Sequence, residues 1–235
     1  MRPSDLPEIR HLPLFSEMLQ ANFEQLMQRA YAQTFPAGVE LIRQGDPADF
    51  LHIVMEGAVE LLAEWDGNTT TMAVVQREGT FILAACIKDA PYLMSARTLE
   101  RSRVVLIPAP DLRAVFRRDP EFAVSTITEL AGCYRAVVRH AKGLKLRNSR
   151  QRVAAYLIKQ QRQVTPEMTF DLPIEKRMIA SYLGMTPENL SRTLKALEED
   201  GVQVRGSTVR ITDHARLAAV AKPDPLLDGP DVQVV

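Results

Sequence analysis

The segment that most constrains the fold of this chain is 174–200, IEKRMIASYLGMTPENLSRTLKALEED. It predicts two helices joined by a three-residue turn. Gly184 suits the left-handed conformation that follows a helix end, and Thr186 followed by Pro187 is typical of a helix start. The apolar face of the second helix is predicted from spacings of four and three, at Leu190, Leu194 and Leu197. This layout is that of a helix-turn-helix motif.

The other face of the second helix is polar and charged. In a major groove, Arg can donate two hydrogen bonds to guanine, and Glu can accept one from cytosine. Behind this helix, residues 201–213 (GVQVRGSTVRITD) predict a two-stranded wing, with Arg205 and Arg210 near phosphates and Asp213 as the N-cap of a last short helix. The residues predicted to contact double-stranded DNA are Thr186, Glu188, Asn189, Ser191, Arg192, Lys195 and Arg205.

Charge is unevenly distributed along the chain. Residues 145–222 carry 14 Lys and Arg against 8 Asp and Glu, a net +6. Residues 1–144 carry 15 against 18, a net −3, and the whole chain is neutral. The basic block coincides with the helix-turn-helix segment, which favours contact between this part and a polyanion.

The first half of the chain has a different pattern. Residues 15–32 predict an amphipathic helix with Leu19, Phe23, Leu26, Met27 and Ala30 on one face. Short β-branched and apolar segments follow from about 34 to 108, and DGN at 66–68 predicts a hairpin. The stretch 79–97 lies between strand segments and is predicted to be an apolar loop and turn. Many short strands without intervening helices predict an antiparallel barrel or roll, so that the chain as a whole is α+β.

A short helix near 109–119, ended by Pro120, and then a long helix over 120–146 are predicted next. The long helix would span about 40 Å, which exceeds what a small roll covers, so we expect a coiled-coil seam between two copies of the chain. The seam residues are Ile127, Leu130, Tyr134, Val138 and Ala141. Asn148 is the predicted N-cap of the following helix. The predicted parts are 1–119 (roll with N-terminal helix), 120–147 (dimerisation helix), 148–222 (winged helix-turn-helix) and 223–235 (disordered tail).

The two cysteines, Cys86 and Cys133, are too few for a four-cysteine zinc site or iron–sulfur cluster. No apolar run approaches the length of a membrane span, and no secretory signal is recognisable, so a cytoplasmic protein without membrane contact is expected.

These segments together resemble the cyclic-AMP receptor protein/FNR family of bacterial transcription regulators over residues from about 12 to 220. The resemblance rests on Gly45, Gly57 and Gly79 at the glycine spacings of the roll, on the long helix, and on GMTPENLSRTLKALEEDGVQ. It implies a cyclic-nucleotide-binding-like roll, a homodimer and RNA polymerase as a partner. The Glu-x-x-Ser-Arg pattern of the second helix implies TTGA-like inverted half-sites. LKLRNSRQRVAAYLI and APYLMSART are similar to the nitric-oxide-responsive DNR/NnrR subgroup.

The resemblance also implies where a cyclic nucleotide would bind, and the expected residues are missing. The glutamate position is Ala84, the Arg-Ser pair falls near Ala90-Pro91, and the purine hydroxyls correspond to Val137 and Val138. A buried phosphate would lack compensation, so cyclic AMP is not expected. The predicted pocket is apolar and consists of Phe81, Leu83, Ala84, Cys86, Met94, Tyr134, Val137 and Val138.

Two kinds of effector remain open for this pocket. One is haem, as the DNR-like resemblance implies, with His11, His52, His140, Cys86, Cys133 or Met94 as candidate iron ligands. The other is a small apolar or aromatic molecule, or no effector at all. Two other functional classes remain as alternatives. A cupin-like metalloenzyme would need several metal ligands on the roll, where only His52 lies, and a scaffold module would use the helix-turn-helix for protein contacts only.

Overall fold

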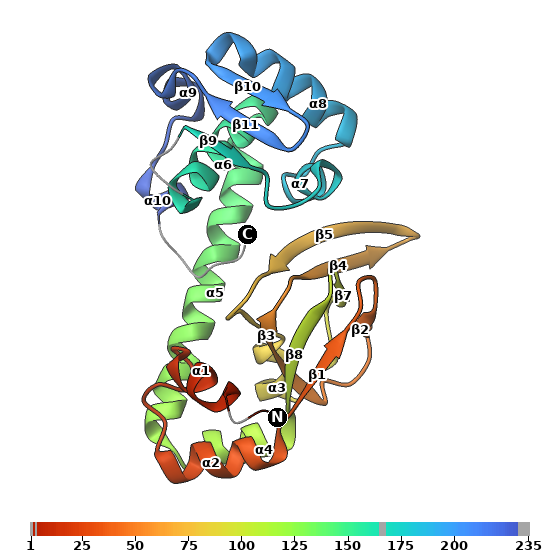
Figure 1. Ribbon diagram of the computed structural model, residues 1–235, viewed down its shortest axis with the longest axis vertical. Helices are drawn as coiled ribbons and strands as arrows, with labels where there is room; N and C mark the ends of the chain where they lie inside the picture. Colours follow the sequence, from red (N-terminus) through yellow and green to blue (C-terminus); the bar gives the residue numbers. More distant parts are fainter. Residues whose placement is uncertain (1, 3, 165–167, 230–235) are drawn as a thin grey trace. The chain divides into compact units, whose positions relative to one another are not determined.

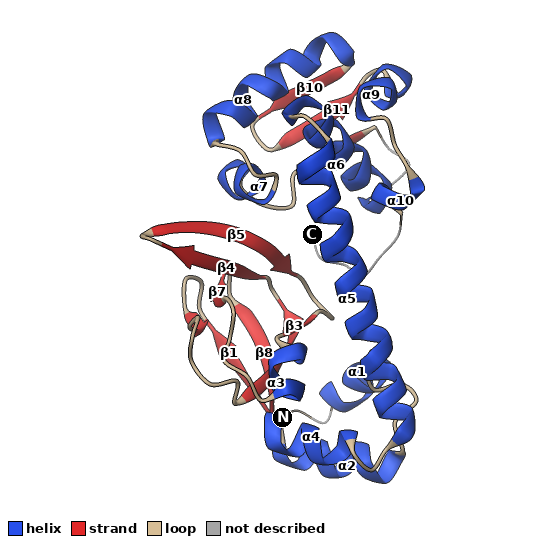
Figure 2. Ribbon diagram, turned by 180° about the vertical axis from the view of Figure 1, so that it is seen from behind, coloured by secondary structure: helices blue, strands red, loops and turns tan. Residues whose placement is uncertain are grey.

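The computed structural model describes residues 2, 4–164 and 168–229. The chain divides into two compact units between Tyr134 and Arg135, within one long helix, α5 (Pro120–Leu146). The sequence places this division at the ends of the helix, but each unit contains one half of it. Each unit is described separately below (Figures 1 and 2).

The first unit contains a β-roll made of two four-stranded antiparallel sheets, which confirms the predicted fold class. Both sheets pair strands that are distant in the sequence. The first sheet, in spatial order, contains β1 (Tyr31–Phe35), β8 (Ser102–Pro108), β3 (Phe50–Glu56) and β6 (Thr80–Phe81). The second contains β2 (Glu40–Ile42), β7 (Ser95–Thr98), β4 (Val59–Trp65) and β5 (Asn68–Val75).

Local sequence signals set the turns of the roll. Asp66 and Gly67 both have positive φ, 49° and 73°, and join β4 to β5 as the predicted two-residue hairpin. Gly57 has a φ of +83°, and a Cβ at this position would lie 2.5 Å from Ser102 Oγ and 2.7 Å from the Arg101 carbonyl oxygen. Any side chain there would collide with backbone, so this glycine is required for the close approach of β3–β4 to β8.

Four helices accompany the roll in the first unit, in addition to the first half of α5. They are α1 (Asp5–His11), α2 (Gln20–Arg29), α3 (Leu83–Lys88) and α4 (Ala109–Phe116). Phe15 and Phe122 are fully buried, and their rings stack with centroids 5.9 Å apart, so the chain after α1 packs on the start of α5. An ion pair between buried Asp5 and Arg103 fixes α1 to β8.

Three helix predictions are wrong in detail. Leu19 precedes α2 and is 54% exposed, so it does not belong to the buried helix face. The stretch 79–97 contains a helix, α3, in addition to loops. The short helix α4 ends at Phe116, before Pro120, which begins α5 as the predicted range 120–146 requires. The Asp119 side chain between them accepts hydrogen bonds from the backbone N–H groups of Phe122 (3.0 Å) and Leu19 (3.0 Å) and from Asn22 Nδ2 (2.9 Å).

The second unit is a winged helix-turn-helix domain that follows the end of α5. Asn148 separates α5 from α6 (Ser149–Val164), and its side chain accepts a hydrogen bond from the Gln151 backbone (2.9 Å) while Gln151 Oε1 accepts one from the Asn148 backbone (3.0 Å). This reciprocal pair confirms the predicted cap. The domain continues with β9 (Thr169–Asp171), α7 (Lys176–Tyr182), α8 (Pro187–Ala196), the 3₁₀ turn η1 (Leu197–Asp200), β10 (Val202–Arg205), β11 (Thr208–Ile211) and α9 (His214–Ala221).

The tail also differs from the prediction. Residues 225–228 form a short helix, α10 (Pro225–Asp228), where the sequence predicts disorder. Asp224 is its N-cap and accepts a hydrogen bond from the Leu226 backbone at 2.7 Å. The rest of the tail, from 230, lies outside the described residues. Among the described helices, none is both long and apolar enough to cross a membrane.

Candidate nucleic-acid interface

The helix-turn-helix is formed by α7, a tight turn and α8. Leu183 ends α7, and Gly184 follows with a φ of +63°, as its position after a helix predicts. Thr186 is the N-cap of α8, and its Oγ1 accepts a hydrogen bond from the Asn189 backbone at 3.2 Å. Leu190, Leu194 and Leu197 are buried, so the leucine face of this segment packs inward.

The opposite face of α8 is open to solvent. Glu188, Ser191, Arg192 and Lys195 are all exposed, and they lie along the first two and a half turns of the helix. Arg192 and Lys195 form no salt bridge with any other described residue. A row of this kind presents one carboxylate, one hydroxyl and two cationic groups to a common partner.

The start of α8 keeps Glu188 ionised. Its own backbone N–H, the Thr186 hydroxyl and, more weakly, the charge of Arg192 hold the pKa of Glu188 below its ordinary value. A carboxylate at this position can only accept hydrogen bonds. It is therefore suited to an exposed base amino group and unsuited to a phosphate.

Asn189, which the sequence groups with the DNA-contacting residues, is turned toward the protein. Its Nδ2 lies 3.4 Å from Ser149 Oγ at the start of α6. The side chain is only partly exposed. It thus connects α8 to α6, and its predicted contact with DNA remains untested.

The wing contains one strand more than predicted. β9 pairs with β11, which gives the order β10-β11-β9. Asp171 at the end of β9 accepts a hydrogen bond from Thr208 Oγ1 (2.7 Å) and so fixes the base of the wing turn. Arg205 and Arg210 are exposed as expected. The three residues of β9 are too few to show a period of two, which is why the sequence indicates only a loop.

Arg152 on α6 joins the end of α5 to the turn of the helix-turn-helix. Its Nη1 donates to the carbonyl of Arg147 (2.9 Å) and approaches that of Leu144 (3.4 Å), while Nη2 approaches the carbonyl of Gly184 (3.4 Å). Carbonyls at a helix end have no partner within the helix, so a cation is stabilising there. Sequence reasoning missed this residue, because its partners are carbonyl groups and leave no residue pattern.

Aromatic rings make a second contact between α5 and α7. The rings of His140 and Tyr182 lie 4.5 Å apart, and Tyr156 of α6 lies 6.5 Å from Tyr182. Burial, followed by the charges of Lys159 and Arg152, lowers the pKa of His140, so this ring is neutral at neutral pH. The orientation of the helix-turn-helix is thus set by the last turns of α5.

Large apolar side chains are exposed along α5. Ile127 and Tyr134 are 59% and 70% exposed, and Val138 continues the same face one turn after Tyr134. Ala141 is partly buried, and Leu130 packs against the core of the first unit. A shallow hollow of about 310 Å³ lies on this face between Val138, Ala141, Lys142, Lys145 and Leu146. Such a stripe on a helix is typical of a surface that another helix covers.

Comparison with known proteins assigns both halves of the chain. Residues 32–119 match the family model of the cyclic nucleotide-binding domain, and residues 151–220 match that of the Crp-like helix-turn-helix domain. These two domains follow one another in the order of the cyclic-AMP receptor protein/FNR regulators. The chain belongs to this family.

Relatives within the family align over nearly the whole chain. The transcriptional activator protein FnrL of Cereibacter sphaeroides is 28% identical over 95% of this chain and 93% of its own length. The cyclic AMP receptor protein of Thermus thermophilus is 26% identical over 89% of this chain and 96% of its own. The structure of FixK2 from Bradyrhizobium japonicum shares the fold, with a TM-score of 0.70 at 23% identity over 81% of this chain and 96% of that one. The chain is therefore a DNA-binding transcription regulator of the cyclic-AMP receptor protein/FNR type.

The roll of this family member is packed around apolar side chains. Phe81, Leu83 and Cys86 of the predicted effector pocket are buried in the core of the first unit, and Met94 packs against that core. Ala84, at the position of the family glutamate, is exposed. Tyr134 lies in the first unit, whereas Val137 and Val138 belong to the second and are exposed. That these residues form one pocket stays a prediction.

The arginine nearest the family's phosphate-binding segment is already paired. Arg97 Nη2 lies 2.9 Å from Glu60 Oε2, and Glu60 also accepts a hydrogen bond from Thr71 Oγ1 at 2.6 Å. The Glu60 side chain is buried, so separating this pair would leave an uncompensated buried charge. Arg97 is therefore not free to hold a phosphate in this arrangement.

The candidate haem ligands lie in separate places. His11 is exposed and its Nδ1 lies 2.6 Å from the Pro7 carbonyl, while His140 packs on Tyr182 in the second unit. His52 on β3 is 2% exposed, and its Nδ1 has no partner, but its ring stacks on Phe81 with centroids 4.9 Å apart. Cys86 is fully buried and Cys133 partly, both as thiols. The unpaired Nδ1 of His52 could serve as an iron ligand, yet haem would have to displace the side chains packed around it, so this arrangement does not fit haem.

The buried ring of His52 should make the stability of the roll depend on pH. Burial lowers the pKa of His52 to about 4, against a backbone hydrogen bond at Phe50 that raises it. The folded state thus prefers the neutral ring, and stability is lost as the pH falls from about 6.5 toward 4, by about 3 kcal/mol in total. Urea unfolding at pH 7 and pH 4.5 should show this loss in the natural protein and much less of it in His52→Phe. Equal losses of stability in both proteins would show that protonation of His52 is not the cause.

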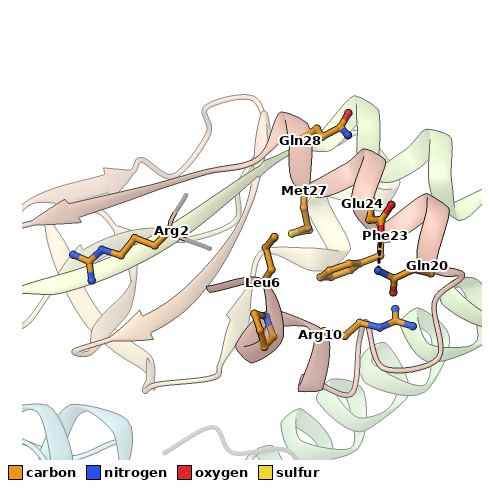
Figure 3. A pocket seen from close by; sticks show the side chains of 9 residues that line it. Arg2, Leu6, Arg10, Gln20, Phe23, Glu24, Met27 and Gln28 are labelled. Carbon is orange, nitrogen blue, oxygen red and sulfur yellow. Dashed lines mark hydrogen bonds between the residues drawn. The ribbon is translucent and has the colours of Figure 1, made fainter. Parts of the chain in front are cut away.

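A larger hollow, of about 590 Å³, lies between α1 and α2 (Figure 3). Leu6, Phe23 and Met27 form its apolar part, and the Arg10 guanidinium stands 5.2 Å from the centre of the Phe23 ring. Gln20 and Glu24 are joined by a hydrogen bond of 2.7 Å at its edge. None of the predicted effector residues lines this hollow. Within the described residues, no three His, Cys, Asp or Glu side chains are grouped so that they could hold a metal ion.

Proposed function

We propose that this regulator acts as a homodimer on an inverted repeat of TTGA-like half-sites, and that an effector other than cyclic AMP controls it. The observation that carries the DNA-binding part is the exposed face of α8, where Glu188, Ser191 and Arg192 stand on a helix supported by buried leucines. Glu can accept from cytosine N4 and Arg can donate to guanine O6 and N7. The family pattern Glu-x-x-Ser-Arg supports TTGA as the half-site sequence.

The apolar stripe on α5 supports the dimer. Burial of Ile127, Tyr134 and Val138 against the same residues of a second copy would remove a contiguous apolar surface from water. A two-fold axis along α5 would present two recognition helices to half-sites about one helical turn of DNA apart. The FnrL relative is named an activator. By that analogy we infer that this dimer activates transcription by contacting RNA polymerase.

The chemistry of the roll supports the exclusion of cyclic AMP. Ala84 replaces the family carboxylate, and Arg97 is held by buried Glu60. A phosphodiester buried there would not find a free cationic partner in Arg97. The apolar character of Phe81, Leu83 and Cys86 favours a small apolar effector over haem, which the packing at His52 does not fit. Such an effector would act by stabilising one of two orientations of the DNA-binding domains.

Selection from a pool of random DNA duplexes tests the DNA-binding proposal. The full chain should enrich inverted repeats whose half-sites contain TTGA and whose centres lie about 10 base pairs apart. Enrichment of unrelated or unpaired motifs would refute it. The effector proposal is tested separately by titrating the protein with cyclic AMP and with haem: we expect no heat of binding at millimolar cyclic AMP and no Soret band after haem reconstitution, and either signal would contradict it.

A further inference from the structure

The end of the chain is bound to the end of the dimerisation helix. Residues 222–229, called the strap here, follow α9 and include α10. Arg147, directly after α5, donates two hydrogen bonds to the Asp228 carboxylate, at 2.7 and 2.6 Å, and one to the Lys222 carbonyl at 3.2 Å. The Arg147 and Asp228 side chains are only 9% and 19% exposed. A planar guanidinium that bonds both carboxylate oxygens has a fixed geometry.

Two further groups of α5 hold the strap. Arg139 Nη1 donates to the Gly229 carbonyl at 2.9 Å, and Lys142 Nζ lies 3.5 Å from the Leu226 carbonyl. Gly229 allows this approach, because a Cβ there would lie 2.6 Å from the Pro225 carbonyl oxygen and 3.2 Å from Arg139 Nη2. The strap therefore contacts more than two turns of α5, in a geometry that depends on a glycine.

Asp228 faces both sides of the junction between α5 and α6. Burial alone would raise its pKa, but the hydrogen bonds from Arg147 and the Asp224 backbone, together with the charges of Arg147 and of Arg162 on α6, hold the pKa below its ordinary value. The carboxylate is thus bound by Arg147, just before the break at Asn148, and is further stabilised by the more distant charge of Arg162 beyond it. Arg152 already joins the same α5 end to the turn of the helix-turn-helix, through α6.

We propose that the strap is a positioning element that locks the junction between α5 and α6 and thereby fixes the distance between the two recognition helices of the dimer. The chain passes from α5 into the winged helix-turn-helix domain at a single break, Asn148, and reaches the end of α9 only after the whole domain. The strap returns from α9 to α5 and closes this path into a ring. With the strap in place, the junction has less freedom than it would have with only the Arg152 hydrogen bonds and the His140–Tyr182 ring contact. The effect on half-site spacing rests on the proposed function.

Hydrogen exchange of the full chain, without DNA, tests the lock directly. Asp228→Asn keeps the size of the side chain and removes its charge, and Gly229→Ala disturbs the seat of the strap without changing charge. We expect amides in residues 143–153 to exchange about tenfold faster in both variants, since hydrogen bonds to a charged group are lost or strained. Glu198→Gln is the matched control, because Glu198 is an exposed carboxylate in the same unit, and it should leave these rates unchanged. Unchanged exchange at 143–153 in both strap variants would overturn the proposal.

The dependence of DNA affinity on half-site spacing separates two roles of the strap. A strap that only stabilises the fold would leave this dependence unchanged. The natural protein should lose at least about tenfold in affinity when one base pair is inserted between the half-sites, and the strap variants should lose about threefold or less. Equal losses in all proteins would overturn the positioning role. If the natural protein does not prefer an inverted repeat at all, the proposed function fails, and the exchange experiment still decides whether the strap locks the junction.

Discussion

Arg192→Ala is expected to abolish specific DNA binding, lowering affinity for a TTGA inverted repeat by at least about thirtyfold. A well-placed Arg–guanine contact contributes about 1–3 kcal/mol of discrimination, and the dimer contains two of them. Arg192 is exposed on α8, so the fold should tolerate its loss. Fluorescence anisotropy at one fixed salt concentration measures the change, with a scrambled duplex of equal length alongside.

A matched variant separates base reading from general charge. Arg216→Ala removes the same charge from α9 in the same unit, where the side chain is exposed and pairs only with Asp213 at 3.4 Å. It should weaken binding to the repeat and to the scrambled duplex by the same small factor. If Arg192→Ala still discriminates TTGA from scrambled half-sites, Arg192 does not read the sequence.

Tyr134→Glu is expected to convert the dimer into a monomer at micromolar concentration. Tyr134 lies at the centre of the exposed α5 stripe, and burial of a large apolar side chain contributes about 1.5–3 kcal/mol, counted twice in a two-fold dimer. The new carboxylates would also face each other across the seam. Together these effects should weaken dimerisation by more than about a hundredfold, which sedimentation equilibrium can measure.

Thr128→Glu provides the control for the seam. Thr128 is exposed on α5, about a quarter turn away from the stripe, so the same charge should leave the dimer intact. A Tyr134→Glu protein that stays dimeric would show that the stripe is not the seam. If the natural chain sediments as a monomer, the homodimer itself is wrong.

Features encoded by neighbouring residues could be predicted from the sequence. Gly184 and Thr186 mark the turn of the helix-turn-helix because their conformations depend on local backbone chemistry, and Asp66-Gly67 specifies its hairpin in the same way. Asn148 forms its cap with Gln151, three residues away. In each case the partner lies within a few residues, so a short stretch of sequence contains all the residues that determine the feature.

Features that depend on distant partners could not be predicted. The tail indicates disorder by composition, yet Asp228 pairs with Arg147, 81 residues earlier in the chain. The short helix is predicted to run to Pro120, but α4 ends at Phe116, and Asp119 after it accepts hydrogen bonds from Asn22 and Leu19. Asn189 sits on the polar face of α8 by periodicity, but contact with Ser149 of α6 turns it inward. In all three cases, tertiary contacts override a local pattern.

A titration of labelled duplexes with the full chain tests most directly whether a homodimer of this protein binds a TTGA inverted repeat. One duplex carries the TTGA inverted repeat with half-site centres about 10 base pairs apart, and the other carries the same bases in scrambled order. We expect two chains bound per repeat and an affinity for the repeat at least about a thousandfold higher than for the scrambled duplex at 150 mM salt. Equal affinity for the two duplexes, or one chain bound per repeat, would contradict this expectation.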